Sequence, residues 1–188
     1  MRYGEADYED FATQAWAPLF KAAYFLCGSV HDAEELTQIA LTRTYLAWRR
    51  VRPDGAYRYA RKTLVNASID QHLARQRSPI HLVDNVPESS DPSTDSSDAV
   101  DDRMSLVQLL ARLSARERAV VVLRYYDDSS EQEVADMLGL RLGTVKSLAS
   151  RGLAKLRITS ADSDADFEAR SDGDLAGHTA QLSERRHV

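Results

Sequence analysis

Two cations and two hydroxyl side chains near the C-terminus have the spacing of a helix that reads DNA. Lys146, Ser147, Ser150 and Arg151 lie on one side of a helical wheel, opposite an apolar face. Small hydroxyl side chains let a helix approach a groove closely, and lysine and arginine can reach phosphate oxygens or guanine edges. No acidic residue occurs between positions 139 and 158, whereas five basic residues do. The pattern therefore predicts noncovalent recognition of duplex DNA.

Residues suited to covalent chemistry or metal binding do not form a recognisable group. The single cysteine, Cys27, excludes an internal disulfide and a cysteine-rich zinc site. The five histidines, at positions 31, 72, 81, 178 and 187, lack metal-ligand spacing. No nucleophile with a neighbouring base and no phosphate-binding loop is evident. We therefore expect no enzymatic activity, no cofactor and no metal, and we expect Cys27 to be buried and inert.

Helix-start signals occur at three places in the chain. Each has a residue that can cap a helix and an acidic residue three positions later, which is the capping-box spacing. The three pairs are Asp32 with Glu35, Ser114 with Glu117, and Ser130 with Glu133. Together with the helical spacing of apolar residues and the weak strand signal, they predict an all-α fold.

A helix-turn-helix is predicted to position the cations. Gly139 can take the positive φ found just beyond a helix end, and residues 140–143 are expected to form the turn. The apolar face of the next helix is expected to consist of Val145, Ala149, Leu153 and Leu156. A generic amphipathic hairpin is the alternative, which the turn glycine, the small outer residues and the lack of acids disfavour.

Prolines and glycines suggest the boundaries of three earlier helices. Pro18 and Gly28 are expected to bound the first. Pro53 and Gly55 are expected to end a second, long amphipathic helix, and a third is predicted from about residue 56 to residue 77.

Charge and composition divide the chain into two helical units and two acidic segments that contain few apolar residues. The 188 residues have a net charge of −5 and are 43% hydrophobic. Residues 1–77 have 11 basic and 9 acidic side chains, and residues 104–158 have 9 and 6. Residues 78–103 and 159–188 have 7 acidic side chains each and few apolar ones. We expect two small domains, an N-terminal helical bundle at 1–77 and a C-terminal helix-turn-helix at 104–158. A flexible acidic linker would join them at 78–103, and a disordered acidic tail would follow at 159–188.

A membrane segment or secretion signal is not expected. No apolar run approaches the roughly 18 residues that a membrane-spanning helix needs. Residues 1–15 contain acids where a secretion signal would have basic residues followed by an apolar run. The sequence therefore predicts a cytoplasmic protein.

Both helical units resemble bacterial sigma factors of the sigma-70 family, especially the small extracytoplasmic-function (ECF) group with the second and fourth regions only. The segment SEQEVADMLGLRLGTVKSLASRGLAKLR, preceded by LSARERAVVVLRYYDDSS, is similar to the fourth region. DAEELTQIALTRTYLAW resembles the part of the second region that docks on core RNA polymerase, and AYRYARKTLVNASID resembles the part that reads and opens the promoter. The implied partners are core RNA polymerase and promoter DNA, both duplex and melted, with an anti-sigma factor as a further candidate.

The resemblance implies three groups of site residues. The minus-thirty-five group, which would read duplex DNA, is Arg141, Thr144, Lys146, Ser147, Ser150 and Arg151. The minus-ten group, which would bind the melted strand, is Arg49, Arg50, Arg52, Arg58, Arg61, Lys62, Asn66 and Asp70. The polymerase-binding group is Glu34, Glu35, Leu36, Gln38, Ile39 and Arg43. Solvated charges on a bundle helix are the alternative for any one minus-ten residue. Ordinary packing in the helical bundle is the alternative for Leu36 and Ile39.

Two positions depart from the family pattern. Arg141 stands where a serine often caps the recognition helix, and an exposed arginine there could touch phosphate instead. Leu148 stands where a polar residue is common, and the sequence leaves open whether it lies at the core edge or meets a thymine methyl group.

Two other classes of protein fit parts of the pattern. An operator-binding regulator would dimerise through its N-terminal helices and bind duplex DNA without polymerase. A protein-only adaptor, such as an anti-sigma factor, would not need the cations between Lys146 and Arg157. Promoter binding that depends on core polymerase would separate a sigma factor from both.

Overall fold

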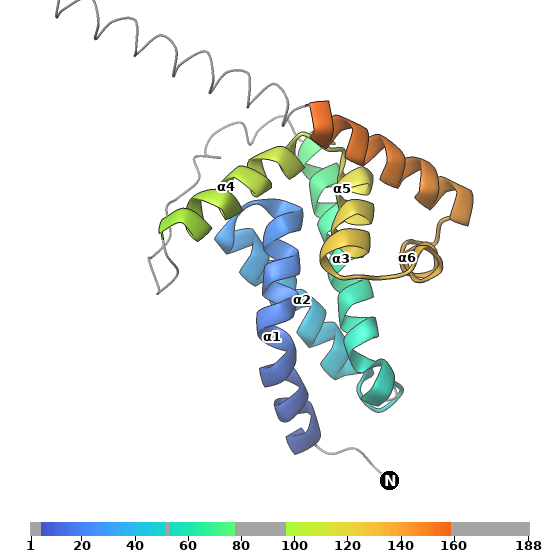
Figure 1. The fold of residues 1–188 in the computed structure, drawn as a ribbon. Helices are drawn as coiled ribbons and strands as arrows, with labels where there is room; N and C mark the ends of the chain where they lie inside the picture. The colour runs from blue at the N-terminus through green and yellow to red at the C-terminus, as the bar shows by residue number, and fades with distance from the viewer. Residues whose placement is uncertain (1–4, 52, 78–96, 159–188) are drawn as a thin grey trace, which may run out of the picture.

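The computed structural model describes residues 5–51, 53–77 and 97–158, and every regular element in these ranges is helical (Figure 1). The all-α prediction is therefore confirmed. The expected tail and residues 78–96 of the expected linker lie outside the described residues. Within the described ranges, no helix has the length and apolar character needed to span a membrane.

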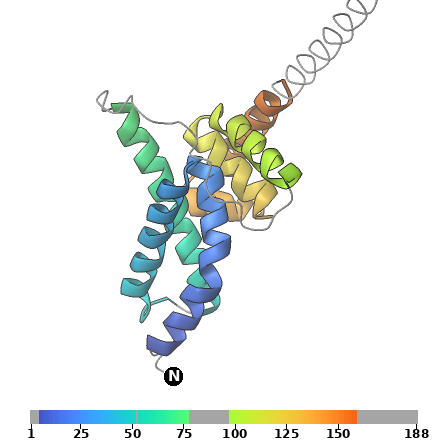
Figure 2. The same cartoon turned by 90° about the vertical axis from the view of Figure 1, so that its left-hand side faces the viewer.

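The helices form two units. The N-terminal unit comprises α1 (Glu5–Cys27), α2 (Val30–Ala47) and α3 (Pro53–Arg77). The C-terminal unit comprises α4 (Ser97–Ala111), α5 (Ala115–Val121), the π-helix η1 (Val122–Tyr126), α6 (Glu131–Leu138) and a last helix that covers residues 142–158. The C-terminal unit packs beside the half of the three-helix bundle that is remote from the N-terminus, against α1 and along α3 (Figure 2).

A leucine-rich core holds the N-terminal unit together. Leu19 of α1, Leu36 of α2 and Leu64 of α3 are fully buried in it. The helix α1 runs through Pro18, so the predicted boundary there is wrong. Burial of Leu19 and Ala23 stabilises this part of α1 and helps to offset the roughly 3 kcal/mol that an interior proline costs.

Three helix starts differ from the sequence prediction. Ser29 caps α2 by accepting a hydrogen bond from the amide of Asp32, so the predicted cap at Asp32 is wrong. The buried Asp32 carboxylate instead accepts a hydrogen bond from Arg75 at 2.9 Å. The helix α3 begins at Pro53, because the fixed φ of proline suits a first turn, where its missing N–H would have no acceptor. The helix α4 begins at Ser97, inside the expected linker, because a helix gains stability with each turn added to a packed one.

The predicted caps of the helix-turn-helix are confirmed, and the turn between its two helices is shorter than predicted. Ser114 and Ser130 form complete capping boxes at the starts of α5 and α6. Gly139 has a φ of 64° directly after α6, in the left-handed region that favours glycine. The last helix begins at residue 142, with main-chain hydrogen bonds to the Arg141 carbonyl, so Arg141 takes the capping position.

The inner face of the last helix packs against the rest of the C-terminal unit. Of the four residues predicted for this face, Val145 and Ala149 are buried, whereas Leu153 and Leu156 are half-buried. Leu148 is only 7% exposed, so it belongs to the core. Gly152 lies so close to α5 that a Cβ atom at this position would be 2.7 Å from Cγ2 of Val121.

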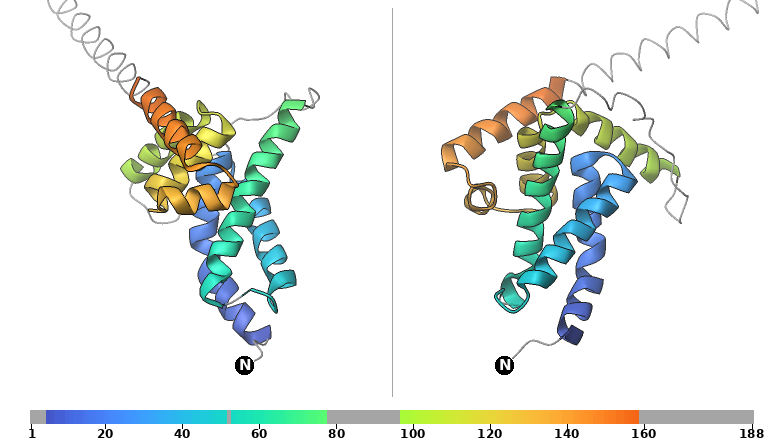
Figure 3. Two further views of the ribbon diagram at one scale, coloured as in Figure 1. Left: turned by 90° about the vertical axis from the view of Figure 1, so that its right-hand side faces the viewer. Right: turned by 180° about the vertical axis from the view of Figure 1, so that it is seen from behind.

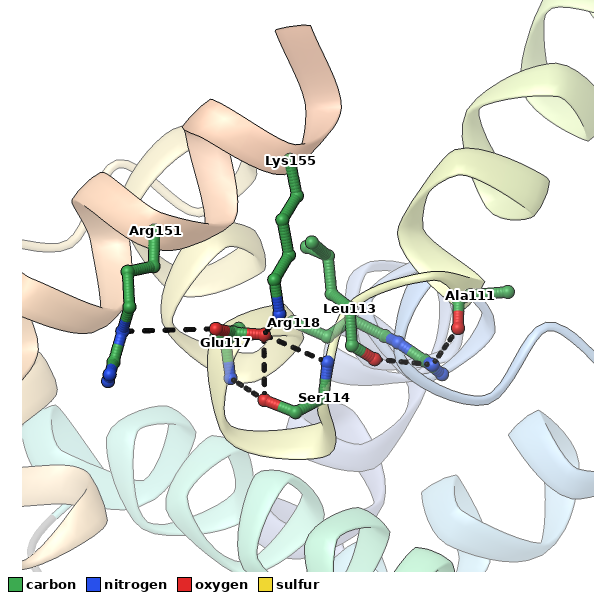
Figure 4. Close-up of polar contacts among 7 residues, drawn as sticks. All are labelled: Ala111, Leu113, Ser114, Glu117, Arg118, Arg151 and Lys155. Atoms are coloured by element: carbon green, nitrogen blue, oxygen red, sulfur yellow. Dashed lines mark hydrogen bonds and ion pairs between the residues drawn. The ribbon is translucent and has the colours of Figure 1, made fainter. Parts of the chain in front are cut away.

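Glu117 joins the cap of α5 to the last helix (Figure 4). Its carboxylate accepts hydrogen bonds from the amide and hydroxyl of Ser114 at 3.1 and 2.9 Å, and from Nζ of Lys155 at 2.7 Å. Arg151 Nε lies 3.9 Å from the second carboxylate oxygen. Burial raises the pKa of Glu117, but the hydrogen bonds from Lys155 and Ser114 outweigh burial and leave this pKa below its usual value. Glu117 is therefore held ionised between two cations of the last helix.

A buried arginine connects the two units. The guanidinium of Arg118 in α5 donates hydrogen bonds to the carbonyl of Leu26, at the end of α1, at 2.7 Å, and to the carbonyl of Ala111, at the end of α4, at 3.1 Å. Beside it, the rings of Phe25 and Tyr126 meet edge to face, with centroids 4.7 Å apart. The last turns of α1 therefore form one side of the interface between the units (Figure 3).

Substitution of Gly152 by alanine should destabilise the protein by about 1–3 kcal/mol, because the added methyl group overlaps the stiff, branched side chain of Val121. Helix propensity alone would favour alanine by about 1 kcal/mol, so a net loss reports the steric effect. Urea unfolding measures the free energy of unfolding. Gly143→Ala is the matched control, because nothing lies within 4 Å of a Cβ atom there. Equal stabilities of the two variants would contradict this packing.

The protein should lose stability in acid as Glu117 becomes protonated. Because the pKa of Glu117 is lower in the folded chain, its stabilising effect is present above the usual glutamate pKa of about 4.3 and is lost as the pH falls through the folded value. Glu117→Gln should therefore show a smaller drop in Tm than the wild type between about pH 6 and pH 3. Glu9→Gln, at an exposed position, is the control and should behave as the wild type. Identical pH profiles for all three proteins would refute this role.

Candidate nucleic-acid interface

The minus-thirty-five group forms one exposed surface at the start of the last helix, which we call the recognition surface. All six side chains are exposed: Arg141, Thr144, Lys146, Ser147, Ser150 and Arg151. The first turns of the last helix project away from the N-terminal unit (Figures 1 and 3). The structure thus brings the whole group together and leaves it open to a large ligand.

Local contacts orient these side chains without burying them. The hydroxyl of Ser147 donates a hydrogen bond to the carbonyl of Gly143 at 2.9 Å. Nζ of Lys146 lies 3.7 Å from Oε2 of Glu131. The side chain of Arg151 is 63% exposed, and its Nε atom lies 3.9 Å from the buried carboxylate of Glu117. Exposed ion pairs typically contribute less than about 1 kcal/mol, so both cations can exchange these partners for phosphates.

The backbone adds to the positive potential of the recognition surface. The first amides of an α-helix have no acceptor within the helix, and the helix dipole places partial positive charge there. Arg141 at the capping position has no side-chain oxygen to offer these amides. Cations and amides together favour an anion such as a nucleic-acid phosphate.

Four residues of the minus-ten group share one face of α3, which we call the basic face, and the C-terminal unit contacts this face, although Arg58 and Lys62 remain exposed. The four are Arg58, Arg61, Lys62 and Asn66. Nη2 of Arg58 lies 3.5 Å from Oδ2 of Asp136. Lys62 donates a hydrogen bond to the Asp136 carbonyl at 3.3 Å, and Asn66 donates one to the Met137 carbonyl at 3.4 Å. The predicted residues are thus brought together, with the end of α6 lying across them.

The contact between Arg61 and Asp127 is the most buried ion pair of the basic face. Nη1 of Arg61 lies 2.8 Å from Oδ2 of Asp127, and each side chain is 12% exposed. The guanidinium also lies 5.8 Å from the centroid of the Tyr57 ring. Burial raises the pKa of Asp127, and the nearby Arg61 lowers this pKa only in part, so it stays above its usual value. The pairing is incomplete, because Arg61 Nε has no hydrogen-bond acceptor in the described part of the chain.

The other members of the minus-ten group lie at the two ends of the basic face. Arg49 and Arg50 are exposed after the end of α2, and Arg52 lies outside the described residues. Asp70 is exposed one turn beyond the basic face on α3. Trp48 is buried against the rings of Tyr8 and Phe11 of α1, so it packs in the core.

The polymerase-binding group follows the outer side of α2, with one exception. Its exposed members are Glu34, Glu35, Gln38 and Arg43. Ile39 is half-buried. Leu36 is only 1% exposed and packs in the bundle core, so its assignment to a partner-binding surface is wrong. Helical periodicity explains the error, because Leu36 lies about 100° around the helix from Glu35.

Cys27 is half-buried and unsuited to nucleophilic chemistry. Its thiol donates a hydrogen bond to the Ser29 carbonyl at 3.3 Å. Burial raises the pKa of Cys27 to about 11, so the thiol is protonated near neutral pH.

Acidic residues that contact both surfaces were not evident as site residues from the sequence. Glu117 was identified only as a cap, although it also holds Lys155 of the last helix. Asp127 and Asp136 were not singled out at all, although they contact the basic face. Their only sequence signal is their negative charge within a basic unit.

Comparison with known proteins assigns both units to one family. Family models described as Sigma-70 region 2 and Sigma-70, region 4 match residues 6–78 and 103–156. The RNA polymerase sigma-E factor of Streptomyces coelicolor is 34% identical over 152 residues, which cover 80% of this chain and 84% of that protein. The ECF RNA polymerase sigma factor SigL of Mycobacterium tuberculosis is 33% identical, with 76% and 82% covered.

A solved structure shows the same fold. It is the sigma factor RpoE of Bartonella quintana in complex with the anti-sigma factor NepR, with a TM-score of 0.65, 21% identity, and 80% of this chain and 94% of that chain covered. The two matched regions coincide with the units that hold the basic face and the recognition surface. The chain therefore belongs to the sigma-70 family of RNA polymerase sigma factors, within its ECF group.

Proposed function

We propose that this protein binds core RNA polymerase, directs it to specific promoters and helps to open them. The observation that carries the proposal is the presence, in one chain of this family, of two separate cationic helix surfaces. The recognition surface is suited to duplex DNA, and the basic face of α3 is suited to a single strand. An operator-binding regulator would need only the first of these surfaces.

The recognition surface binds the major groove of the minus-thirty-five element. Lys146 and Arg151 contact phosphates or guanine edges, and Ser147 and Ser150 let the helix approach closely. Lys155 stays bound to the buried carboxylate of Glu117 and thereby fixes the angle of the last helix relative to α5.

The basic face of α3 binds the melted minus-ten strand. Arg58, Arg61 and Lys62 neutralise its phosphates, and the amide of Asn66 can donate a hydrogen bond to an unpaired base. Arg49 and Arg50 flank a base that has left the stack. The exposed side of α2 binds core polymerase.

Run-off transcription with core polymerase and a library of random promoter templates tests this function. We expect discrete start sites only when the protein is added, because core polymerase alone has no promoter specificity in this scheme. Mobility shifts with the same templates, with and without core polymerase, should show specific binding only in the mixture. Specific duplex binding by the protein alone, with no gain in transcription, would favour an operator-binding regulator instead.

Arg151→Ala should weaken transcription from promoters with a defined minus-thirty-five element. A bidentate contact with a base is worth about 1–3 kcal/mol of discrimination, and a phosphate contact is worth less. Competition between a selected template and one with a scrambled minus-thirty-five element measures this preference in the run-off assay. Arg116→Ala removes the same charge from an exposed site outside the recognition surface and serves as the control. An equal loss of transcription from both templates would show that Arg151 makes only a nonspecific contact with DNA.

A further inference from the structure

A buried acid of α5 contacts the recognition surface from within the C-terminal unit. The side chain of Glu117 is only 6% exposed, and its Oε1 atom lies 3.9 Å from Nε of Arg151. Lys146 also has a carboxylate neighbour, but that neighbour, Glu131, is itself 36% exposed. Arg151 therefore differs from Lys146 in having a carboxylate partner that the protein core holds in place.

The position of the Glu117 carboxylate is fixed by three hydrogen bonds to one of its oxygens. The amide and hydroxyl of Ser114 donate to Oε2 at 3.1 and 2.9 Å, and Nζ of Lys155 donates to the same atom at 2.7 Å. The other oxygen, Oε1, is thereby directed toward Arg151 (Figure 4). Burial raises the pKa of Glu117, but these hydrogen bonds lower it by more, so the carboxylate is charged near neutral pH.

The guanidinium of Arg151 faces this carboxylate with only one of its three nitrogens. Nε lies toward Glu117, and the two Nη atoms point away from it (Figure 4). The two Nη atoms form a planar fork that can donate two parallel hydrogen bonds. Guanine presents two acceptors, O6 and N7, at its edge in the major groove. Arg151 can therefore keep its contact with Glu117 while its fork binds guanine.

We propose that Glu117 is a positioning residue for promoter recognition, which orients the guanidinium of Arg151 so that its fork binds a guanine of the minus-thirty-five element. The proposal rests on the function proposed above and names the base that Arg151 reads. A flexible arginine loses conformational freedom when it binds a base, and this loss weakens binding. A fixed partner at Nε removes part of that freedom before DNA arrives.

The contact is suited to orienting Arg151 without neutralising it. The distance of 3.9 Å exceeds hydrogen-bond length, and 63% of the Arg151 side chain remains exposed to water. Lys155 makes the shorter contact with the same carboxylate. Arg151 thus remains available to DNA as a cation. Loss of the Glu117 charge should therefore change the preference among bases more than the attraction to phosphates.

Competitive run-off transcription with core polymerase and the full-length chain tests the proposal. The two templates are a promoter selected from the random library and a copy in which one G·C pair of the minus-thirty-five element is replaced by A·T. The pair is chosen as the one whose replacement no longer matters to Arg151→Ala. We expect the wild type to prefer guanine there by about tenfold. Glu117→Gln should lower this preference by about threefold, because the amide has no charge to hold Nε.

Two control variants separate orientation of Arg151 from the other contacts of Glu117. Ser114→Ala removes the cap hydroxyl of α5 and lowers stability, but it leaves the carboxylate beside Arg151, so the preference for guanine should remain. Lys155→Met removes the second contact of the last helix with Glu117 and should weaken transcription from both templates alike. A loss of preference in either control equal to that of Glu117→Gln would overturn the proposal.

A variant of Arg151 itself tests the fork without altering the buried acid. Arg151→Lys keeps the charge at an exposed position, so it should fold as the wild type does, but lysine has no fork. It should support transcription and lose the preference for guanine. A preference equal to that of the wild type would contradict the proposed geometry.

A double variant and the wild type complete the test. Glu117→Gln combined with Arg151→Ala should have the preference of Arg151→Ala alone, because no guanidinium is left to orient. A further loss in the double variant, an unchanged preference in Glu117→Gln, or the absence of any guanine that depends on Arg151 would overturn the proposal. The proposed function fails on a different result, the absence of discrete start sites when wild-type protein is added to core polymerase.

Discussion

Two guanidinium groups are buried where the units meet, and each must find acceptors there because burial removes its water. Arg118 finds main-chain carbonyls at the ends of α1 and α4, which hold its charge without a carboxylate. Arg61 finds the Asp127 carboxylate and lies near the Tyr57 ring. The Nε atoms of both guanidinium groups lack an acceptor in the described part of the chain. The interface is thus held along α1 by main-chain carbonyls, whose positions the helix ends fix, and along α3 by an ion pair between two side chains.

Each unit has arginine and lysine side chains on the surface of one helix, but the two units place these side chains in different surroundings. On the last helix, packing of Val145, Leu148 and Ala149 turns the cations outward, and Glu117 holds the helix from its inner side. On α3, the cations lie against another part of the same chain. The exposure of the recognition surface follows from packing within the C-terminal unit. The contacts of the basic face follow instead from the arrangement of the two units, which leaves Arg58 and Lys62 exposed and Arg61 nearly buried.

Signals within a few residues of each other predicted the caps and the turn of the C-terminal unit, but they failed at Pro18 and Asp32 in the N-terminal unit. The capping boxes at Ser114 and Ser130 and the turn at Gly139 were readable because caps and left-handed residues depend on local geometry. The partners of Arg118 and Arg61 were not, since these contacts join residues far apart in the sequence and depend on how the units pack. The role of Gly152 could not be predicted either. This glycine lies inside a helical pattern, and its close contact with Val121 depends on how α5 packs against the last helix. The family resemblance supplied candidate site residues, but it did not predict that the C-terminal unit would contact those on α3.

The negative net charge of the chain is compatible with DNA binding once the acceptors of each cation are considered. DNA carries condensed counterions, and a cation that binds a phosphate releases some of them, which makes affinity depend strongly on salt. On the basic face, Asp127 and Asp136 already contact Arg61 and Arg58. A strand that bound these two cations would have to displace carboxylates of the chain as well as its own counterions. On the recognition surface, the cations are exposed, and Lys146 and Arg151 have only long contacts with carboxylates, at 3.7 and 3.9 Å. The acceptors near each cation therefore say more about DNA binding than the net charge of the chain does.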